Sequence, residues 1–400
     1  MKRIIFHIDV NNAFLSWSAL DMIKNGSKID IRNIPSVVGG DESKRHGIVL
    51  AKSVSAKKAG IVTGEPIYLA RRKVNKLYVA PLNKESYIKY SNEFYKILCK
   101  YSPVVEKYSI DECFLDMTGT EKIFGDPVKL AYKIKDEIYK TLGFTVNVGV
   151  ANSKLCAKMA SDFEKPNKVH TLFDSEIKDK MWPLLVDDLF MVGKSSSKKL
   201  HELNINTIED LAKADTNMLT RHFKSLGKMM HEYANGIDNS PVEKPIPKNQ
   251  GIGNSTTLPE DVEDIVNLKK VLRKLSDMVG IRLREKERYA TVISVQLKNN
   301  RFLNFQHQKK LINPISSNED IYENACELLK EMWKGEPIRL VGLRVSDFTN
   351  STYEQISLFE EKGKTRKRDN IQKAVDEINK KYGSNTIKSA SLFEKEEYKE

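Results

Sequence analysis

Three carboxylates stand where predicted strands end, and they are the residues best suited to chemistry. Residues 3–8 (RIIFHI) predict a buried strand ending at Asp9, and Asp111 and Glu112 fall at the junction of two further predicted strands. Carboxylate oxygens are the ligands that Mg²⁺ prefers. If the fold brings these side chains together, they could bind two Mg²⁺ ions, the arrangement that supports nucleotidyl transfer.

The adjacency of two of these acids raises a geometric question. Neighbouring side chains on a regular strand point to opposite faces, so Asp111 and Glu112 can reach one site only at a bend. The sequence SIDE at 109–112 offers a bend between two strands. An Asp-Glu pair in such a turn can equally be solvated and chemically inert, so the residues alone leave both interpretations open.

The elements that would position the acids follow the order β-α-β-β-α-β, which is typical of a ferredoxin-like fold. They are predicted as a strand at 3–8, a helix at 12–24, a helix at 84–101, two strands within 104–118, a helix at 128–142 and a strand at 145–150. Residues 24–82 interrupt this order as a small basic subdomain, with 12 Lys and Arg against 4 Asp and Glu.

The rest of the chain divides into four further regions. Residues 166–235 predict short helices, and residues 236–248, rich in Pro and polar residues, predict an interdomain linker. Residues 249–348 alternate strands with helices, which predicts a small α+β domain. Residues 349–400 form a charged tail in which we expect one amphipathic helix, at 369–381.

Composition narrows the class of protein. The net charge is +12 over 400 residues, which favours a polyanionic partner such as nucleic acid. The four cysteines form no CxxC pair, so neither a zinc site nor a disulfide framework is expected. No run of 18 apolar residues occurs, so we expect a cytoplasmic protein without membrane contact.

The motif YSIDECFLD (108–116) resembles the central signature of Y-family DNA polymerases of the DNA polymerase IV kind. The resemblance extends over nearly the whole chain. It implies an α/β multidomain fold with a ferredoxin-like palm, small fingers, a helix-hairpin-helix thumb and an α+β little finger. The implied boundaries are palm 1–23 and 83–165, fingers 24–82, thumb 166–235, linker 236–248, little finger 249–348, and a tail at 349–400.

The same resemblance implies roles for the acids. Asp9, Asp111 and Glu112 would be catalytic, and they would bind two Mg²⁺ ions together with the carbonyl of Val10. Phe14, five positions after the first Asp, would be the steric gate that excludes the ribose 2′-OH. An ordinary core aromatic on the first helix is the alternative for that position.

Nucleotide contacts are implied at two lysines. Lys165, in the sequence KPN, would contact the incoming triphosphate, and Lys57 stands where the family usually has Arg. A lysine presents a point charge rather than a fork, and an isolated lysine is usually a solvated surface charge. Val54, Asn11 and Ala13 replace a Tyr, an Asp and an aromatic residue that are common in the family, so nucleotide affinity is in question.

Contacts with DNA are expected in the thumb and the little finger. The turn at 192–195 resembles a helix-hairpin-helix, whose backbone N–H groups bind phosphate, although Met191 replaces one expected glycine and a plain helical hairpin is the alternative. The predicted DNA-contacting residues are Gly193, Lys194, Lys198, Lys199, Arg284, Arg301 and Arg344.

The tail sequence QISLF resembles the pentapeptide that binds the bacterial sliding clamp, with the contacts made by Gln355, Ser357, Leu358 and Phe359. Two adjacent apolar residues in a polar tail imply a partner protein. A weaker repeat of this motif, SLF at 391–393, lacks the glutamine.

We therefore expect a monomeric DNA-directed DNA polymerase that uses primer-template DNA and dNTPs for low-fidelity translesion synthesis. No segment resembles a proofreading exonuclease. A nucleotidyl or guanylyl cyclase shares the two-metal core but does not explain the thumb, the little finger or the clamp motif. A non-catalytic adaptor that binds DNA and the clamp is the remaining alternative, and primer extension separates the two.

Overall fold

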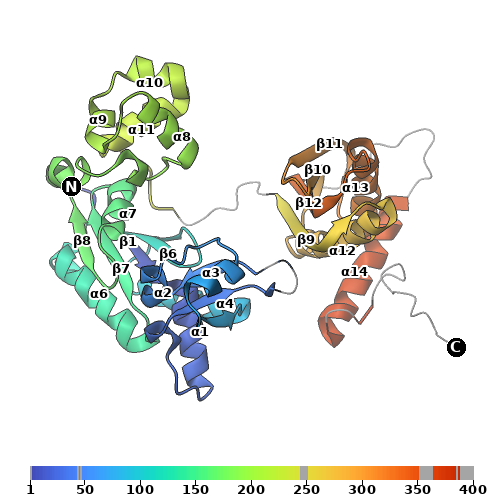
Figure 1. Ribbon diagram of the computed structural model, residues 1–400, viewed down its shortest axis with the longest axis horizontal. Helices are drawn as coiled ribbons and strands as arrows, with labels where there is room; N and C mark the ends of the chain where they lie inside the picture. Colours follow the sequence, from blue (N-terminus) through green and yellow to red (C-terminus); the bar gives the residue numbers. More distant parts are fainter. Residues whose placement is uncertain are drawn as a thin grey trace. The chain divides into compact units, whose positions relative to one another are not determined.

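The computed structural model describes residues 2–42, 45, 47–243, 251–350, 364–383 and 386–387. It divides into two compact units, one formed by Met1–Glu42 and Gly47–Ile246, the other by Ser43–His46 and Pro247–Glu400. Figure 1 follows the chain through both units. Within the described residues, no helix combines the length and the apolar composition needed to cross a bilayer.

The palm is built on a five-stranded sheet. In spatial order its strands are β5 (Val105–Lys107), β6 (Glu112–Asp116), β1 (Ile5–Val10), β7 (Val146–Ala151) and β8 (Val169–Leu172). The central strand β1 is buried at all six positions and pairs antiparallel with both β6 and β7. The predicted β-α-β-β-α-β order is present, with β8 added at the edge beside β7.

Helices cover both faces of this sheet. One face carries α1 (Ala13–Lys24), α4 (Lys84–Leu98) and α6 (Pro127–Leu142), with α5 (Glu121–Phe124) before α6. The other face carries α7 (Lys154–Asp162). Strand alternation turns Phe6 and Ile8 toward the first group of helices. It therefore turns His7 and Asp9 toward α7.

Gly149 on β7 allows α7 to approach the sheet closely. A Cβ atom at this position would lie 1.9 Å from the carbonyl oxygen of Ala157 and 2.6 Å from the backbone nitrogen of Ser161. Only glycine accommodates this contact without a shift of the helix. The close approach brings Lys158 on α7 over the strand ends.

The fingers form a three-stranded sheet with a small core of their own. The strands lie in the order β3 (Val49–Lys52), β2 (Ser36–Gly39) and β4 (Tyr78–Pro81), with η1 (Ile31–Asn33), α2 (Val54–Lys58) and α3 (Ile67–Lys73) beside them. Strand β2 pairs antiparallel with β3 and parallel with β4.

The thumb consists of short helices whose core is continuous with the α7 side of the palm. They are η3 (Asp174–Glu176), η4 (Ile177–Met181), η5 (Val186–Asp188), α8 (Lys194–Glu202), α9 (Ile208–Lys213), α10 (Thr216–Phe223) and α11 (Ser225–Ala234).

The predicted linker at 236–248 begins too early in the chain. The backbone N–H of Leu155 donates to Asp238, and that of Glu243 donates to Glu106. Val242 is buried in the thumb core. Residues 236–243 are thus packed against the rest of the unit. Within this polar stretch, Val242 is buried in the core and Asp238 accepts a hydrogen bond from the palm. Residues 244–248 lie outside the described part.

Lys224 joins α10 to α11 in a backbone conformation suited to glycine, with φ +56° and ψ −135°. Such a conformation costs an ordinary residue on the order of 1–3 kcal/mol. We expect Lys224→Gly to raise the free energy of unfolding by about 1 kcal/mol, measured by urea denaturation, after the entropy cost of glycine is subtracted.

The matched control for this prediction is Lys228→Gly, an exposed position within α11. It should lower the free energy of unfolding by about 1 kcal/mol, because glycine is a poor helix former. Equal destabilisation by both substitutions would show that Lys224 is not strained.

The little finger is a four-stranded antiparallel sheet with helices on one face. Its strands lie in the order β11 (Asn304–Ile315), β10 (Tyr289–Asn299), β12 (Ile338–Thr349) and β9 (Ile252–Val262). Helices α12 (Ile265–Glu285) and α13 (Asn318–Met332) pack on it, and α14 (Lys364–Tyr382) contacts α13. The helix expected at 369–381 is therefore present, begins earlier, and is attached to this domain (Figure 1).

Candidate active site

The strand register brings the predicted catalytic acids to one end of the palm sheet. Asp9 on β1 lies opposite Glu112, the first residue of β6. Asp111 precedes β6 in the bend at 109–111, where its carbonyl accepts from the N–H of Val10 at 3.0 Å. The hydroxyl of Ser109 donates to Asp111 Oδ1 at 2.6 Å. The bend thus removes the strict alternation that would separate two neighbouring acids.

The acids line a cleft between palm and fingers with a volume of about 510 Å³. Its lining includes every residue that the resemblance assigns to catalysis, metal binding or nucleotide binding, namely Asp9, Val10, Phe14, Lys57, Asp111, Glu112 and Lys165. The three positions that depart from the family pattern, Asn11, Ala13 and Val54, line it as well.

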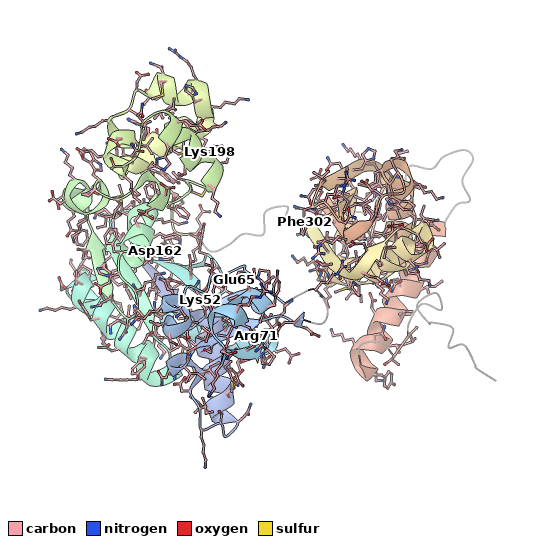
Figure 2. The ribbon with its side chains drawn as sticks, viewed as in Figure 1. Lys52, Glu65, Arg71, Asp162, Lys198 and Phe302 are labelled. Carbon is pink, nitrogen blue, oxygen red and sulfur yellow. The ribbon has the colours of Figure 1, made fainter. Side chains whose placement is uncertain are left out.

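Asp9 is buried and paired with a lysine. Its carboxylate forms an ion pair with Lys165, which also pairs with Asp162 at 2.8 Å. Burial raises the pKa of Asp9 to about 6, although Lys165 acts to lower it. Burial opposes the charge on Lys165 too, but Asp9 and Asp162 outweigh it and raise the pKa of the ammonium. Asp162 is labelled in Figure 2.

Glu112 is held by two basic groups on the α7 side of the sheet. Lys158 Nζ lies 2.8 Å from Glu112 Oε2, and Nε2 of the buried His7 lies 3.2 Å from the same oxygen. Burial alone would raise the pKa of Glu112, but His7 and Lys158 outweigh it and lower the pKa to about 2. Glu112 is therefore a fixed anion at neutral pH.

The donor set fits a divalent cation. Among the described residues, no three His, Cys, Asp or Glu side chains are already arranged around a metal position. Asp9 and Glu112 are instead turned toward Lys165 and Lys158. Hard carboxylate and carbonyl oxygens suit Mg²⁺, and a buried carboxylate with a raised pKa gains from an added positive charge. A cation would thus replace the lysine that now neutralises Asp9.

Phe14, in the first turn of α1, stands between the core and the cleft. Its ring stacks on Tyr87 with centroids 5.0 Å apart and an interplanar angle of 26°. It packs against the palm core and also lines the cleft. The two interpretations of Phe14, as a steric gate and as a core aromatic, are therefore compatible. A ring fixed by the core can present a rigid edge to a ligand.

Sequence reasoning missed three residues around the cleft: His7, Lys52 and Lys158. Lys52 Nζ donates to Thr63 Oγ1 at 3.0 Å, and burial together with the neighbouring Lys57 lowers the pKa of its ammonium. Both Lys52 and Thr63 line the cleft. Figure 2 shows Lys52 on the fingers. No sequence signal marks such residues, because their roles arise from contacts between distant segments.

The predicted thumb turn is present before α8. Gly193 caps the helix, and Lys194, Lys198 and Lys199 are exposed on it. Met191 has a φ of +74°, the conformation that the expected glycine would adopt freely. The element before the turn is the single 3₁₀ turn η5 rather than a full helix.

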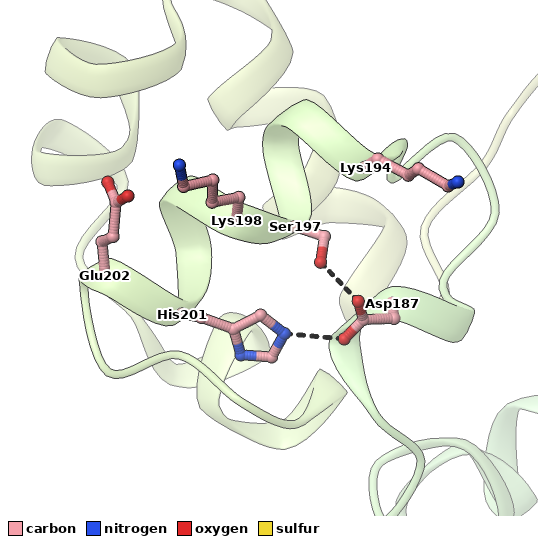
Figure 3. A pocket seen from close by; sticks show the side chains of 6 residues that line it. All are labelled: Asp187, Lys194, Ser197, Lys198, His201 and Glu202. Carbon is pink, nitrogen blue, oxygen red and sulfur yellow. Dashed lines mark hydrogen bonds and ion pairs between the residues drawn. The ribbon is translucent and has the colours of Figure 1, made fainter.

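Figure 3 shows how α8 is attached to η5. Ser197 and His201, both on α8, hydrogen-bond to Asp187, with His201 Nε2 lying 2.7 Å from Asp187 Oδ2. Asn206 and Asp187 raise the pKa of His201. Lys194 and Lys198 line the same pocket. Contact of this surface with DNA remains a prediction.

The little-finger arginines differ in their placement. Arg344 is exposed on β12 and lines an open, polar groove on the sheet, and Arg301 is exposed in the turn after β10. Arg284 was predicted wrongly as a DNA contact. Its side chain is only 7% exposed, and its guanidinium pairs with Asp376 of α14 at 2.5 Å and donates to the carbonyl of Ser316 at 2.7 Å. Because α14 packs against it, Arg284 has a structural role.

We expect Arg284→Ala to lower the free energy of unfolding by about 3 kcal/mol, because it removes the buried guanidinium that pairs with Asp376 and bonds to Ser316. Urea denaturation measures this loss. Arg344→Ala is the matched control, with a change in stability below about 0.5 kcal/mol. It should weaken DNA binding and reduce the slope of log affinity against log salt concentration by about 1. Weaker DNA binding by a fully stable Arg284→Ala protein would restore the original assignment.

The clamp-binding motif lies outside the described residues. This holds for all four of its predicted contacts, Gln355, Ser357, Leu358 and Phe359, and for the second motif at 391–393.

Three protein-family models match parts of the chain. The model of the impB/mucB/samB family matches residues 8–162, and the model of that family's C-terminal domain matches residues 249–358. A model described as the thumb domain of DNA polymerase-iota matches residues 187–238.

Individual relatives are similar in sequence over nearly the whole chain. The chain is 50% identical to the DNA polymerase IV of Clostridium acetobutylicum, covering 99% of this chain and 100% of that protein. It is 34% identical to the DNA polymerase IV 1 of Bacillus subtilis, covering 100% and 95%. A solved chimaeric Y-family DNA polymerase shares the fold, with a TM-score of 0.77 at 24% identity over 87% of this chain and 100% of that one. The chain therefore belongs to the DNA polymerase IV group of the Y-family DNA polymerases.

Proposed function

We propose that this translesion DNA polymerase joins dNTPs to a primer 3′-OH at the cleft between palm and fingers, with Asp9, Asp111 and Glu112 as ligands of two Mg²⁺ ions. The observation that carries the proposal is the convergence of the three acids, Phe14, Lys57 and Lys165 on one cleft. Family membership makes the chain a DNA-directed DNA polymerase that depends on a divalent metal. The number of ions and the residue roles are our proposal.

The acids differ in what they contribute. Lys158 and His7 hold Glu112 as a fixed anion, whereas Asp9 is paired with Lys165, which a bound cation would replace. The bound ions would supply Lewis acidity at the primer hydroxyl and charge neutralisation at the leaving pyrophosphate. Val10 offers a carbonyl from the end of β1 to the same site.

Lys165 would gain its role from this replacement. With a cation bound to Asp9, Lys165 would lose that ion-pair partner while it still lines the cleft. An ammonium group in that position can bind the triphosphate of the incoming nucleotide. Lys57 on α2 adds a second positive charge from the fingers.

Further partners are proposed from the remaining regions. The exposed lysines of α8 and Arg301 and Arg344 of the little finger would contact the phosphates of primer-template DNA without reading sequence. The pentapeptide at 355–359 would bind the bacterial sliding clamp. We further propose a monomer in the cytoplasm.

Primer extension tests the proposed function. The full chain is incubated with primed DNA, dNTPs and Mg²⁺, on an intact template and on one carrying an abasic site. We expect extension on both templates, with frequent misincorporation, and loss of extension on addition of EDTA. DNA binding without extension would favour the non-catalytic adaptor instead.

A further inference from the structure

Two buried side-chain amides lie behind the catalytic cleft. Asn11 follows the end of β1 and is 6% exposed, and Asn147 on β7 is fully buried. Asn11 Nδ2 donates to Asn147 Oδ1 at 3.1 Å. Asn147 stands opposite Asp9 in the sheet register, so the pair adjoins the predicted metal site.

Every polar atom of the two amides has a partner, and backbone groups fix both orientations. Asn11 Oδ1 accepts from the N–H of Asn167 at 2.9 Å, and Asn147 Oδ1 accepts from the N–H of Lys168 at 3.2 Å. Asn147 Nδ2 donates to the carbonyls of Ser161 and Glu164, at 3.0 and 2.7 Å. Because backbone N–H groups only donate and carbonyls only accept, neither amide can flip without losing these bonds.

The partners of the amides enclose the loop that carries Lys165. Backbone groups on both sides of this lysine, at Glu164, Asn167 and Lys168, are bound to the two side chains. The loop connects α7 with β8, so these bonds attach it to the ends of the central strands. They set the position from which Lys165 reaches Asp9 and the cleft.

We propose that Asn11 and Asn147 are positioning residues that act through Lys165 and set the affinity for the triphosphate of the incoming nucleotide. This inference rests on the proposed function and deepens it. An aspartate at position 11 could accept from Asn167 but could not donate to Asn147, so its second oxygen would face another acceptor. Asn11 and Asn147 are thus a matched pair, and the departure at position 11 has a physical reason within this chain.

The test is a cycle of variants at positions 11 and 165. Steady-state kinetics of single-dNTP incorporation give KM and kcat for the native chain, Asn11→Leu, Lys165→Ala and the double variant. We expect Asn11→Leu to raise the KM for dNTP about 10-fold and to change kcat less than about threefold, since it releases the loop without altering the acids. In the Lys165→Ala background, Asn11→Leu should change KM less than about twofold, because residues that act together are not additive.

A general loss of palm structure would give a different result. Ser102→Ala serves as the control, because Ser102 is a buried palm residue whose hydroxyl bonds to the carbonyl of Asp116, away from the cleft. It should lower the unfolding temperature without changing the KM for dNTP. If Asn11→Leu fails to fold, Asn11→Ala removes the same two bonds without placing apolar methyl groups against the freed polar groups.

Three results would overturn the inference. An equal rise in KM in the native and Lys165→Ala backgrounds would show that Asn11 does not act through Lys165. If Lys165→Ala itself left the KM for dNTP unchanged, Lys165 would make no contact with the nucleotide. The loop would then have no such contact to position. Absence of extension by the native chain would overturn the proposed function and this inference together, and it is recognised without any variant.

Discussion

Replacement of Asp111 by alanine is expected to slow single-turnover primer extension by about 1,000-fold or more, which corresponds to about 4 kcal/mol of lost transition-state stabilisation. Asp111 lies in the bend before β6 and bonds to the hydroxyl of Ser109, whereas Asp9 and Glu112 are paired with lysines. It is thus the acid that can accept a cation with the least rearrangement. Binding of DNA, measured by fluorescence anisotropy, should stay within about twofold of the native value, because the proposed phosphate contacts are in the thumb and the little finger.

Asp116→Ala is the matched control for this prediction. Asp116 lies at the other end of β6 and accepts from the N–H of Thr118 at 2.9 Å, outside the cleft. It should retain extension within about threefold, since it removes a carboxylate from the far end of β6 without touching the site. A full rate with Asp111→Ala, or an equal loss with Asp116→Ala, would contradict the role assigned to Asp111.

The central part of the palm could be predicted from sequence because its signals are local. A run of buried apolar residues predicted the first strand, and helical spacing predicted α4 and α6. The bend at 109–111 was also recognisable, since two adjacent acids can share one site only if alternation is broken. The resemblance then added the pairing of distant strands, which local patterns do not contain.

The charge partners of the site could not be predicted, because they depend on contacts between distant segments. Lys158 is one of several lysines on a helix, and only the close packing of α7 at Gly149 brings it to Glu112. Lys165 was predicted as a nucleotide contact, and it forms an ion pair with Asp9. A lysine displaced from Asp9 by a cation could make the predicted contact.

The error at Arg284 has the same physical origin. A basic residue near the end of an amphipathic helix resembles an exposed charge, and nothing nearby in the sequence indicates that α14 will cover it. The ion pair with Asp376 spans 92 residues of chain. By contrast, Arg344 lies on the strand face away from α12 and α13, where alternation alone keeps it exposed.

Replacement of Phe14 by alanine is expected to reduce the preference for dNTPs over ribonucleotides by about 100-fold or more, because rejection of one hydroxyl by a rigid wall is lost when the wall is removed. The ring is held by stacking on Tyr87 and by the palm core, so it cannot retreat from an added 2′-OH. Ratios of kcat/KM for a matched dNTP and ribonucleotide give the measurement. Incorporation of the dNTP itself should fall by less than about tenfold, since the acids and lysines are unchanged.

Phe94→Leu separates the gate from a general loosening of the palm. Phe94 belongs to the same aromatic core, where it packs on Phe144, but it does not line the cleft. This substitution should lower stability by about 1 kcal/mol while leaving the sugar preference unchanged. If both variants admit ribonucleotides equally, selectivity arises from the rigidity of the whole core rather than from the edge of one ring. If neither does, the ribose is excluded by another part of the cleft, and Phe14 is only a core residue.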